Sequence, residues 1–260
     1  MQVLEKIRRG KSHAQLASHR ARRFLESKAN GVVQDFDSEP EYLIVKAYSR
    51  RAAPPSLSIL TGECLYQLRS ALNHLICHLA EANGESIVDD VKIEFPIRWQ
   101  DTNRATNDGL KWWEERIGKL CSVKQAIILS EQPFERWKHE PKSDPLWLLY
   151  ALSDFDRHKS VHATMVTTNL ARFETEPAEA VASFVKVSEV FGPVNGDAEV
   201  ARFRIAHSAP VASVEVKSDV RLELVFDGGT AAAGLPIVST LGAIGMRVAE
   251  VFDALRKPCP

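Results

Sequence analysis

Arginine and histidine recur at one fixed spacing at two places in this 260-residue chain. Arg69 precedes His74 by five positions, with Asn73 next to the histidine, and Arg157 precedes His162 at the same spacing. A histidine can move protons near neutral pH, and an arginine binds anionic groups through a fixed fork of donors. One interpretation of the two strings is therefore metal-free acid–base chemistry.

The second string lies inside a dense run of charge, Asp154-Phe155-Asp156-Arg157-His158-Lys159. On a helix, Asp154 and His158 are four residues apart, so the carboxylate can orient the imidazole ring and raise its basicity. Burying such groups is costly unless they are paired, which predicts a polar cluster with partners. The candidate catalytic residues are Arg69, Asn73, His74, Asp154, Arg157 and His158.

The same histidines also fit a metal site. His74 and His78 are four residues apart, as are His158 and His162, and two facing helices could supply four imidazoles. A third interpretation is structural, with the histidines on a solvated face and the charged run in an ion-paired helix–helix contact. The chain has no phosphate-binding or dinucleotide-binding glycine motif, so no cofactor is expected.

Two helices must position these residues. Apolar residues recur at three- and four-residue spacing over residues 57–82, which predicts a long helix with a buried stripe. At about 100° per residue, Arg69 and His74 lie about 140° apart on this helix and flank the stripe. Ser143-Asp144-Pro145 predicts the start of the second helix, which is expected to run from residue 145 to about 168.

The whole chain predicts an α+β fold. Residues 1–170 are expected to form a helical, bundle-like part with one early strand at 41–49 and an extended segment at 93–97. Residues 171–260 are expected to form an antiparallel β part near residues 172–228 and a closing C-terminal helix that packs back on the helical part. The other expected helices are 3–28, 108–119 and 236–257, and the expected strands are 181–191, 199–207, 211–217 and 220–227.

Composition limits the classes of partner. The net charge of −1 favours neither a nucleic-acid binder nor a membrane-surface binder as a whole, although the helix at 3–28 is rich in arginine. No apolar run approaches the roughly 20 residues of a membrane span, and the N-terminus has no apolar signal region. The four cysteines form no C-x-x-C pair, so we expect reduced thiols and a cytoplasmic protein without a membrane partner.

The string Arg69-Ser70-Ala71-Leu72-Asn73-His74 resembles the signature of HEPN-type endoribonucleases, which are helical domains. In that family the arginine and histidine converge on RNA at a homodimer cleft. The resemblance implies that His74 is the acid–base for attack by a ribose 2′-hydroxyl, that Arg69 is the phosphate clamp and that Asn73 supports them. It thus implies a metal-independent RNA-cleaving or RNA-binding protein of a bacterial stress, toxin or phage-defence system.

Three short strings, Leu-Arg-Ser-Ala-Leu-Asn-His, Phe-Pro-Ile and Asp-Arg-His-Lys, are also similar to a widespread group of uncharacterised bacterial proteins. That similarity implies a bacterial source and carries no activity. Two other functions therefore stay open at this point: a non-enzymatic protein-interaction module, and a His-rich metal-binding helical protein.

Overall fold

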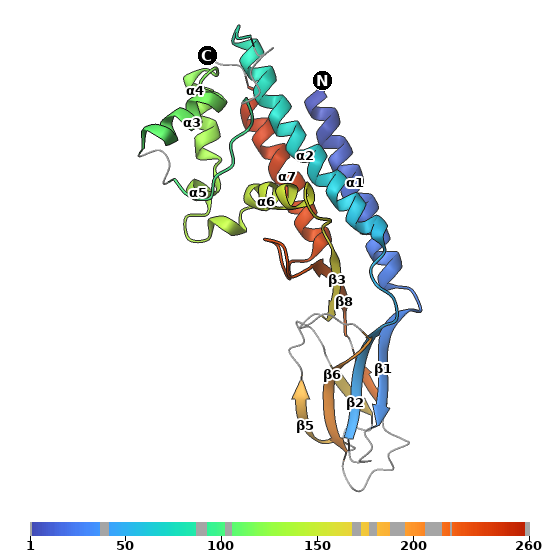
Figure 1. Cartoon of the computed structure of the whole chain (residues 1–260). Coiled ribbons are helices and arrows are strands. Elements are labelled where there is room, and N and C mark those ends of the chain that lie inside the picture. Colours follow the sequence, from blue (N-terminus) through green and yellow to red (C-terminus); the bar gives the residue numbers. More distant parts are fainter. Residues whose placement is uncertain are drawn as a thin grey trace.

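The structure is a computed structural model, and it describes residues 2–36, 42–86, 93–101, 106–167, 173–176, 181–187, 196–205, 215–218 and 220–257. Three long helices pack side by side, and antiparallel strands extend from one end of them (Figure 1). The predicted α+β class is confirmed, including the C-terminal helix that contacts the first helix. The helices are α1 (Gln2–Leu25), α2 (Pro55–Ala82), α3 (Asn107–Ile117), α4 (Ser122–Ser130), α5 (Pro133–Arg136), α6 (Pro145–Asp156) and α7 (Ile237–Leu255).

The strands form one larger sheet and two smaller pairs, all antiparallel. The larger sheet has the order β1-β2-β6-β5, while β3 pairs with β8 and β4 with β7. This sheet combines strands from before and after residue 170. The division of the chain into a part before and a part after that residue stays a prediction. The strands are β1 (Asn30–Phe36), β2 (Tyr42–Ser49), β3 (Ala163–Thr167), β4 (Phe173–Glu176), β5 (Val181–Val187), β6 (Gly196–Ile205), β7 (Glu215–Ser218) and β8 (Leu222–Phe226).

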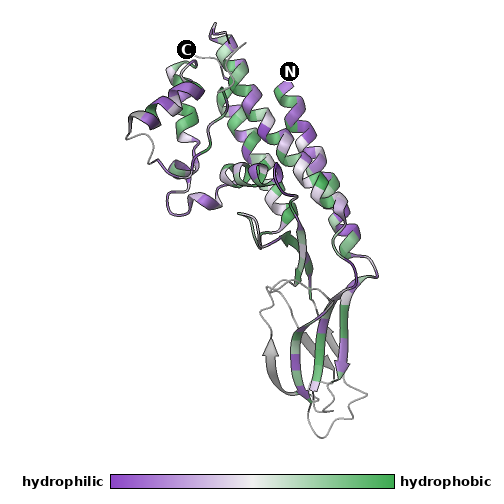
Figure 2. Cartoon of the chain, viewed as in Figure 1, coloured by the Kyte–Doolittle hydropathy of each residue, from purple (hydrophilic) through white to green (hydrophobic). Residues whose placement is uncertain are grey.

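The main hydrophobic core surrounds α2. Its apolar stripe is buried against α1, α6 and α7, with Leu65, Leu68 and Leu72 almost completely inaccessible to solvent. Figure 2 shows hydrophobic residues along the central helices and in strands β1, β2 and β6. Burying one leucine side chain contributes about 1.5–3 kcal/mol, so this stripe stabilises the helix that carries Arg69 and His74.

The close approach of α1 to α2 requires a glycine. A Cβ at Gly10 would lie 2.7 Å from Cδ2 of the buried Leu68. We expect Gly10→Ala to lower the free energy of unfolding by about 1–3 kcal/mol because of overpacking, although alanine favours a helix. The control is Gly242→Ala in α7, where a Cβ meets no atom within 4 Å and alanine should stabilise by about 0.5–1 kcal/mol. Denaturant unfolding measures the free energy of unfolding of both variants. Equal stabilisation by the two substitutions would contradict the close packing at Gly10.

The largest difference from the sequence predictions is the end of α6. The helix expected to reach about residue 168 ends at Asp156, and the chain turns and enters β3. β3 pairs with β8 in a register that sets Ala163 opposite Phe226, and Met165 is buried. Pairing and burial of this β-branched segment outweigh the weak helical preference of residues 157–168. The prediction that these residues continue the helix is therefore wrong.

Other differences are smaller. Asn30 does follow the end of α1, where its Nδ2 donates to the Phe24 carbonyl at 2.6 Å, but it also begins strand β1. The short helices α4 and α5 were not among the expected helices. The turn expected at Gly192-Pro193 lies outside the described residues.

The thiols only partly match expectation. Cys64 and Cys77 are free, but Cys121 is disulfide-bonded, so the prediction that every thiol is reduced is wrong. Tertiary packing places the start of α4 beside the end of α7, where Lys124 Nζ donates to the Leu255 carbonyl at 2.6 Å. Cys259 lies outside the described residues.

No helix in the described part of the chain has both the length and the apolar character that a membrane span needs.

Candidate functional site

A pocket of about 540 Å³ lies between α2 and α6. The structure brings five of the six candidate catalytic residues to its lining, although they come from two helices far apart in the sequence. The sixth, His158, is exposed on the turn after α6 and does not line the pocket. The five lining candidates are Arg69, Asn73, His74, Asp154 and Arg157.

Arg69 and Asn73 bind the extended segment at residues 93–97. Arg69 Nη1 donates to the Phe95 carbonyl at 2.9 Å, and Asn73 Oδ1 accepts from the Phe95 amide at 3.2 Å. The Arg69 side chain is only 15% exposed, and burial lowers the pKa of its guanidinium while Glu94 opposes that shift. Part of the predicted constellation therefore has a structural role, because it fixes this segment to α2.

Glu94 is a pocket residue that sequence analysis missed. Its carboxylate pairs with Arg69 Nη2 at 3.4 Å and with Arg116 Nε at 3.0 Å. It lies between Ile93 and Phe95, which are both buried. In an extended segment the residue between two buried ones faces the other side, so the sequence alone carried no signal for the ion pairs of Glu94.

His74 is half-buried on the α2 wall of the pocket. Burial lowers the pKa of its imidazole, and the positive charge of Lys6 on α1 lowers that pKa further. No described residue forms a hydrogen bond with the ring, so both nitrogens are open to a ligand. A neutral imidazole near pH 7 can accept a proton from a bound hydroxyl group.

Asp154 and Arg157 form the α6 wall. They are paired with each other, and the carboxylate does not bind His158 as the sequence had suggested. The reason is the end of α6, because residue 158 no longer follows the helical path on which four-residue spacing puts side chains together. The Arg157 side chain is 69% exposed and is therefore accessible to a ligand in the pocket.

The predicted four-histidine metal site does not form. His74 lines the pocket between α2 and α6, His78 lines another pocket near α7, and His162 lines a third. Within the described ranges no group of three or more histidine, cysteine, aspartate or glutamate residues could hold a metal ion. The metal prediction required His158 and His162 to share a helix, and both lie beyond the end of α6.

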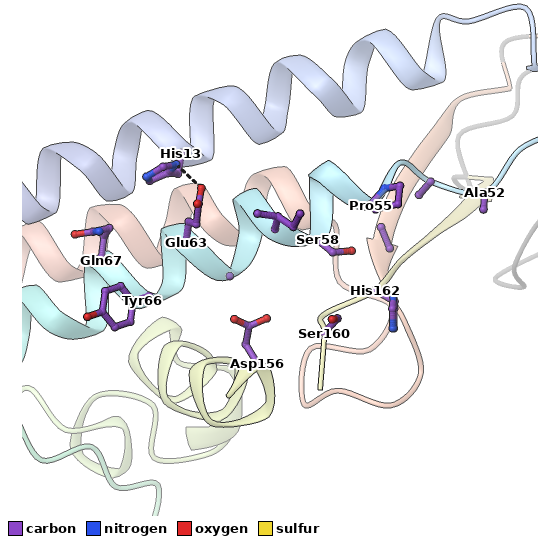
Figure 3. Close-up of a pocket in the computed structure, with 14 residues that line it drawn as sticks. His13, Ala52, Pro55, Ser58, Glu63, Tyr66, Gln67, Asp156, Ser160 and His162 are labelled. Atoms are coloured by element: carbon purple, nitrogen blue, oxygen red, sulfur yellow. Dashed lines mark ion pairs between the residues drawn. The ribbon is translucent and has the colours of Figure 1, made fainter. Parts of the chain in front are cut away.

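A larger pocket of about 900 Å³ adjoins the first and shares Gly62, Tyr66 and Asp156 with it (Figure 3). A Cβ at position 62 would overlap the Asp156 carboxylate, so glycine allows this carboxylate to approach α2. Burial raises the pKa of Asp156, and the backbone amide of Val161 opposes the shift. Sequence analysis did not select Asp156, because its position against Gly62 depends entirely on packing between α2 and α6.

The far side of the larger pocket carries a second charged pair. His13 Nδ1 on α1 lies 3.1 Å from Glu63 Oε2 on α2, an ion pair when the imidazole is protonated (Figure 3). Lys6 on α1 lies 5.9 Å from the Tyr66 ring centroid, next to the boundary between the pockets. The two pockets thus form a continuous groove on α2, with α1 on one side and α6 on the other.

Comparisons of the chain with protein-family models, with curated proteins and with solved structures found no match. The fold and the groove therefore define the class: an α+β protein in which a half-buried histidine and two arginines line one pocket between α2 and α6. Because fold alone does not determine function, an activity must be argued from this pocket.

Proposed function

We propose that this chain is a metal-independent RNA-cleaving protein of a bacterial stress, toxin or phage-defence system, acting in the cytoplasm. The observation that carries the proposal is His74, a half-buried imidazole with a lowered pKa in a pocket that two arginines also line. RNA contains the two groups that this arrangement suits, an ionisable 2′-hydroxyl and an adjacent anionic phosphate. The resemblance of the Arg69–His74 string to HEPN-type endoribonucleases supports the same substrate.

In the proposed reaction His74 accepts the proton of a ribose 2′-hydroxyl. The 2′-oxygen then attacks the neighbouring phosphorus, a 2′,3′-cyclic phosphate forms, and the 5′-oxygen leaves with a proton from water. Arg157 can exchange its partner Asp154 for the phosphate, because both side chains are more than half exposed. Arg69 adds positive charge at the back of the pocket, where its position is fixed by Phe95 and Glu94.

The homodimer implied by the resemblance stays part of this proposal. Ile59 is a large, exposed side chain that lines the larger pocket on α2, and a second copy of the chain would cover it. RNA binding without cleavage is the alternative function for the same groove, and the experiment below distinguishes it from catalysis.

The test is incubation of the purified protein with total RNA, with and without EDTA, at several values between about pH 5 and 8. We expect cleavage in both conditions. Since the folded-state pKa of His74 is lowered from 6.5, its neutral form dominates at pH 7, and the midpoint of the rise of the rate with pH should lie below pH 6.5. Loss of cleavage in EDTA would contradict the metal-independent mechanism. If the protein binds RNA but leaves it intact, it is an RNA-binding protein without this activity. If the protein neither binds nor cleaves RNA, the proposal is overturned.

A further inference from the structure

The larger pocket lies where a nucleotide next to the cleaved phosphate would have to go. It adjoins the His74 pocket through Gly62, Tyr66 and Asp156, which line both. Its volume of about 900 Å³ is in the range of pockets that enclose small molecules. An RNA strand whose phosphate lies at His74 can therefore place a neighbouring base in this pocket.

Asp156 is a charged group in this pocket that still has hydrogen-bonding capacity. An ionised carboxylate has about four acceptor positions. Among the described residues its donor is the Val161 amide, and no lysine or arginine pairs with it. Figure 3 shows the carboxylate pointing into the space below α2, between Tyr66 and Ser160. Burial disfavours the charged form of this carboxylate. Hydrogen bonds from a ligand would therefore stabilise the charged carboxylate and contribute to the binding free energy.

Tyr66 supplies an aromatic surface at the same place. Its side chain is 65% exposed and lies at the boundary of the two pockets. Unstacked bases of single-stranded RNA commonly stack on such rings while their Watson–Crick edges bind polar groups. The other carboxylate of this pocket, that of Glu63, is already next to His13. The arrangement is thus an aromatic surface beside one carboxylate that accepts from the Val161 amide and pairs with no described lysine or arginine.

We propose that the larger pocket binds a guanine base of single-stranded RNA, with Asp156 accepting hydrogen bonds from guanine N1–H and N2–H and Tyr66 stacking on the ring. Guanine presents two adjacent donors on its Watson–Crick edge. Adenine and cytosine each present one amino group next to an acceptor nitrogen, and the uracil N3–H lies between two carbonyls. A carboxylate only accepts hydrogen bonds, so it matches guanine alone. This inference rests on the proposed function and adds a base preference to it.

The test measures binding of short single-stranded oligoribonucleotides that differ only in one base, by fluorescence anisotropy. The protein carries His74→Ala, so that the RNA stays intact. We expect the guanine oligomer to bind about 5- to 100-fold more tightly than the adenine, cytosine and uracil oligomers. Asp156→Asn should remove this preference, because an amide offers one donor in place of an acceptor. Asp253→Asn is the control, and it should keep the preference because Asp253 is an exposed carboxylate on α7 that lines neither pocket.

Tyr66→Ala keeps the inference testable if Asp156→Asn fails to fold, because Tyr66 is exposed. This variant should weaken binding of all four oligomers by about tenfold. Equal binding of the four oligomers, or a guanine preference that survives Asp156→Asn, would overturn the inference. If the wild-type protein cleaves RNA with no base preference, the inference fails but the proposed function stands. If the protein binds no oligomer and cleaves no RNA, both the inference and the proposed function are overturned.

Discussion

Replacing His74 with alanine is expected to reduce the rate of RNA cleavage by about 10²- to 10⁴-fold, the contribution typical of a positioned acid–base group. The imidazole is the pocket group whose lowered pKa leaves it neutral near pH 7, and alanine removes the only proton acceptor of this kind from the described lining. The measurement is the initial rate of cleavage of a defined single-stranded RNA under single-turnover conditions. The fold should persist, because the His74 ring forms no hydrogen bond with a described residue.

The matched control is His78→Ala. His78 lies one helical turn further along α2, is exposed, and lines the pocket near α7 instead of the His74 pocket. Its replacement should leave the rate within about twofold of wild type, since surface changes away from the site have small effects. Equal rates for wild type and His74→Ala, or an equal loss in both variants, would remove His74 from the mechanism. Arg69→Ala would be less informative, because it also releases Phe95 and Glu94.

Replacing Arg247 with methionine is expected to lower the free energy of unfolding by about 3–5 kcal/mol, the usual loss when one partner of a buried ion pair is removed. The Arg247 side chain is 4% exposed, pairs with Glu131 and donates to the Glu131 carbonyl at 3.1 Å. It also lowers the pKa of the buried Asp144, which burial otherwise raises. Methionine fills the space but leaves both carboxylates without this cation.

Denaturant unfolding of Arg247→Met and of Arg256→Met separates burial from simple loss of charge. Arg256 on the same stretch of chain is 64% exposed and pairs with Asp253 at 2.9 Å, so its loss should cost at most about 1 kcal/mol. Because the folded-state pKa of Asp144 is raised, its protonated form is favoured in the fold, and stability from this group is lost as pH rises through that pKa. The deficit of Arg247→Met should therefore shrink as the pH is lowered. Equal losses for both variants would contradict this.

Local signals predicted α2 and the start of α6. The apolar periodicity at 57–82 corresponds to α2, and the sequence start signal at Asp144 corresponds to the start of α6, where Asp144 Oδ1 accepts from the Leu146 amide at 2.7 Å. Both features are decided within a few turns of chain, by spacing and by an N-cap. The angle of about 140° between Arg69 and His74 follows from sequence, but the pocket that both line is completed by α6 and by Glu94.

Contacts between distant segments were beyond local reasoning. β2 pairs with β6, with Tyr42 opposite Arg204, and nothing near either residue specifies the other. The same holds for Glu94, which approaches Arg69 and Arg116 from a segment that the sequence showed only as extended. Pairing of this kind depends on which surfaces can be buried together once the helices have packed.

By itself the sequence determined the α+β class and the long helices, because periodicity and capping act over a few residues. Only the tertiary structure decided the end of α6, since β3 is stabilised by hydrogen bonds to β8 about 60 residues later in the chain. That single end separates His158 from the pocket and brings Asp156 against Gly62, where its carboxylate lines both pockets. The physical reason is that burial and strand pairing are properties of the packed chain as a whole.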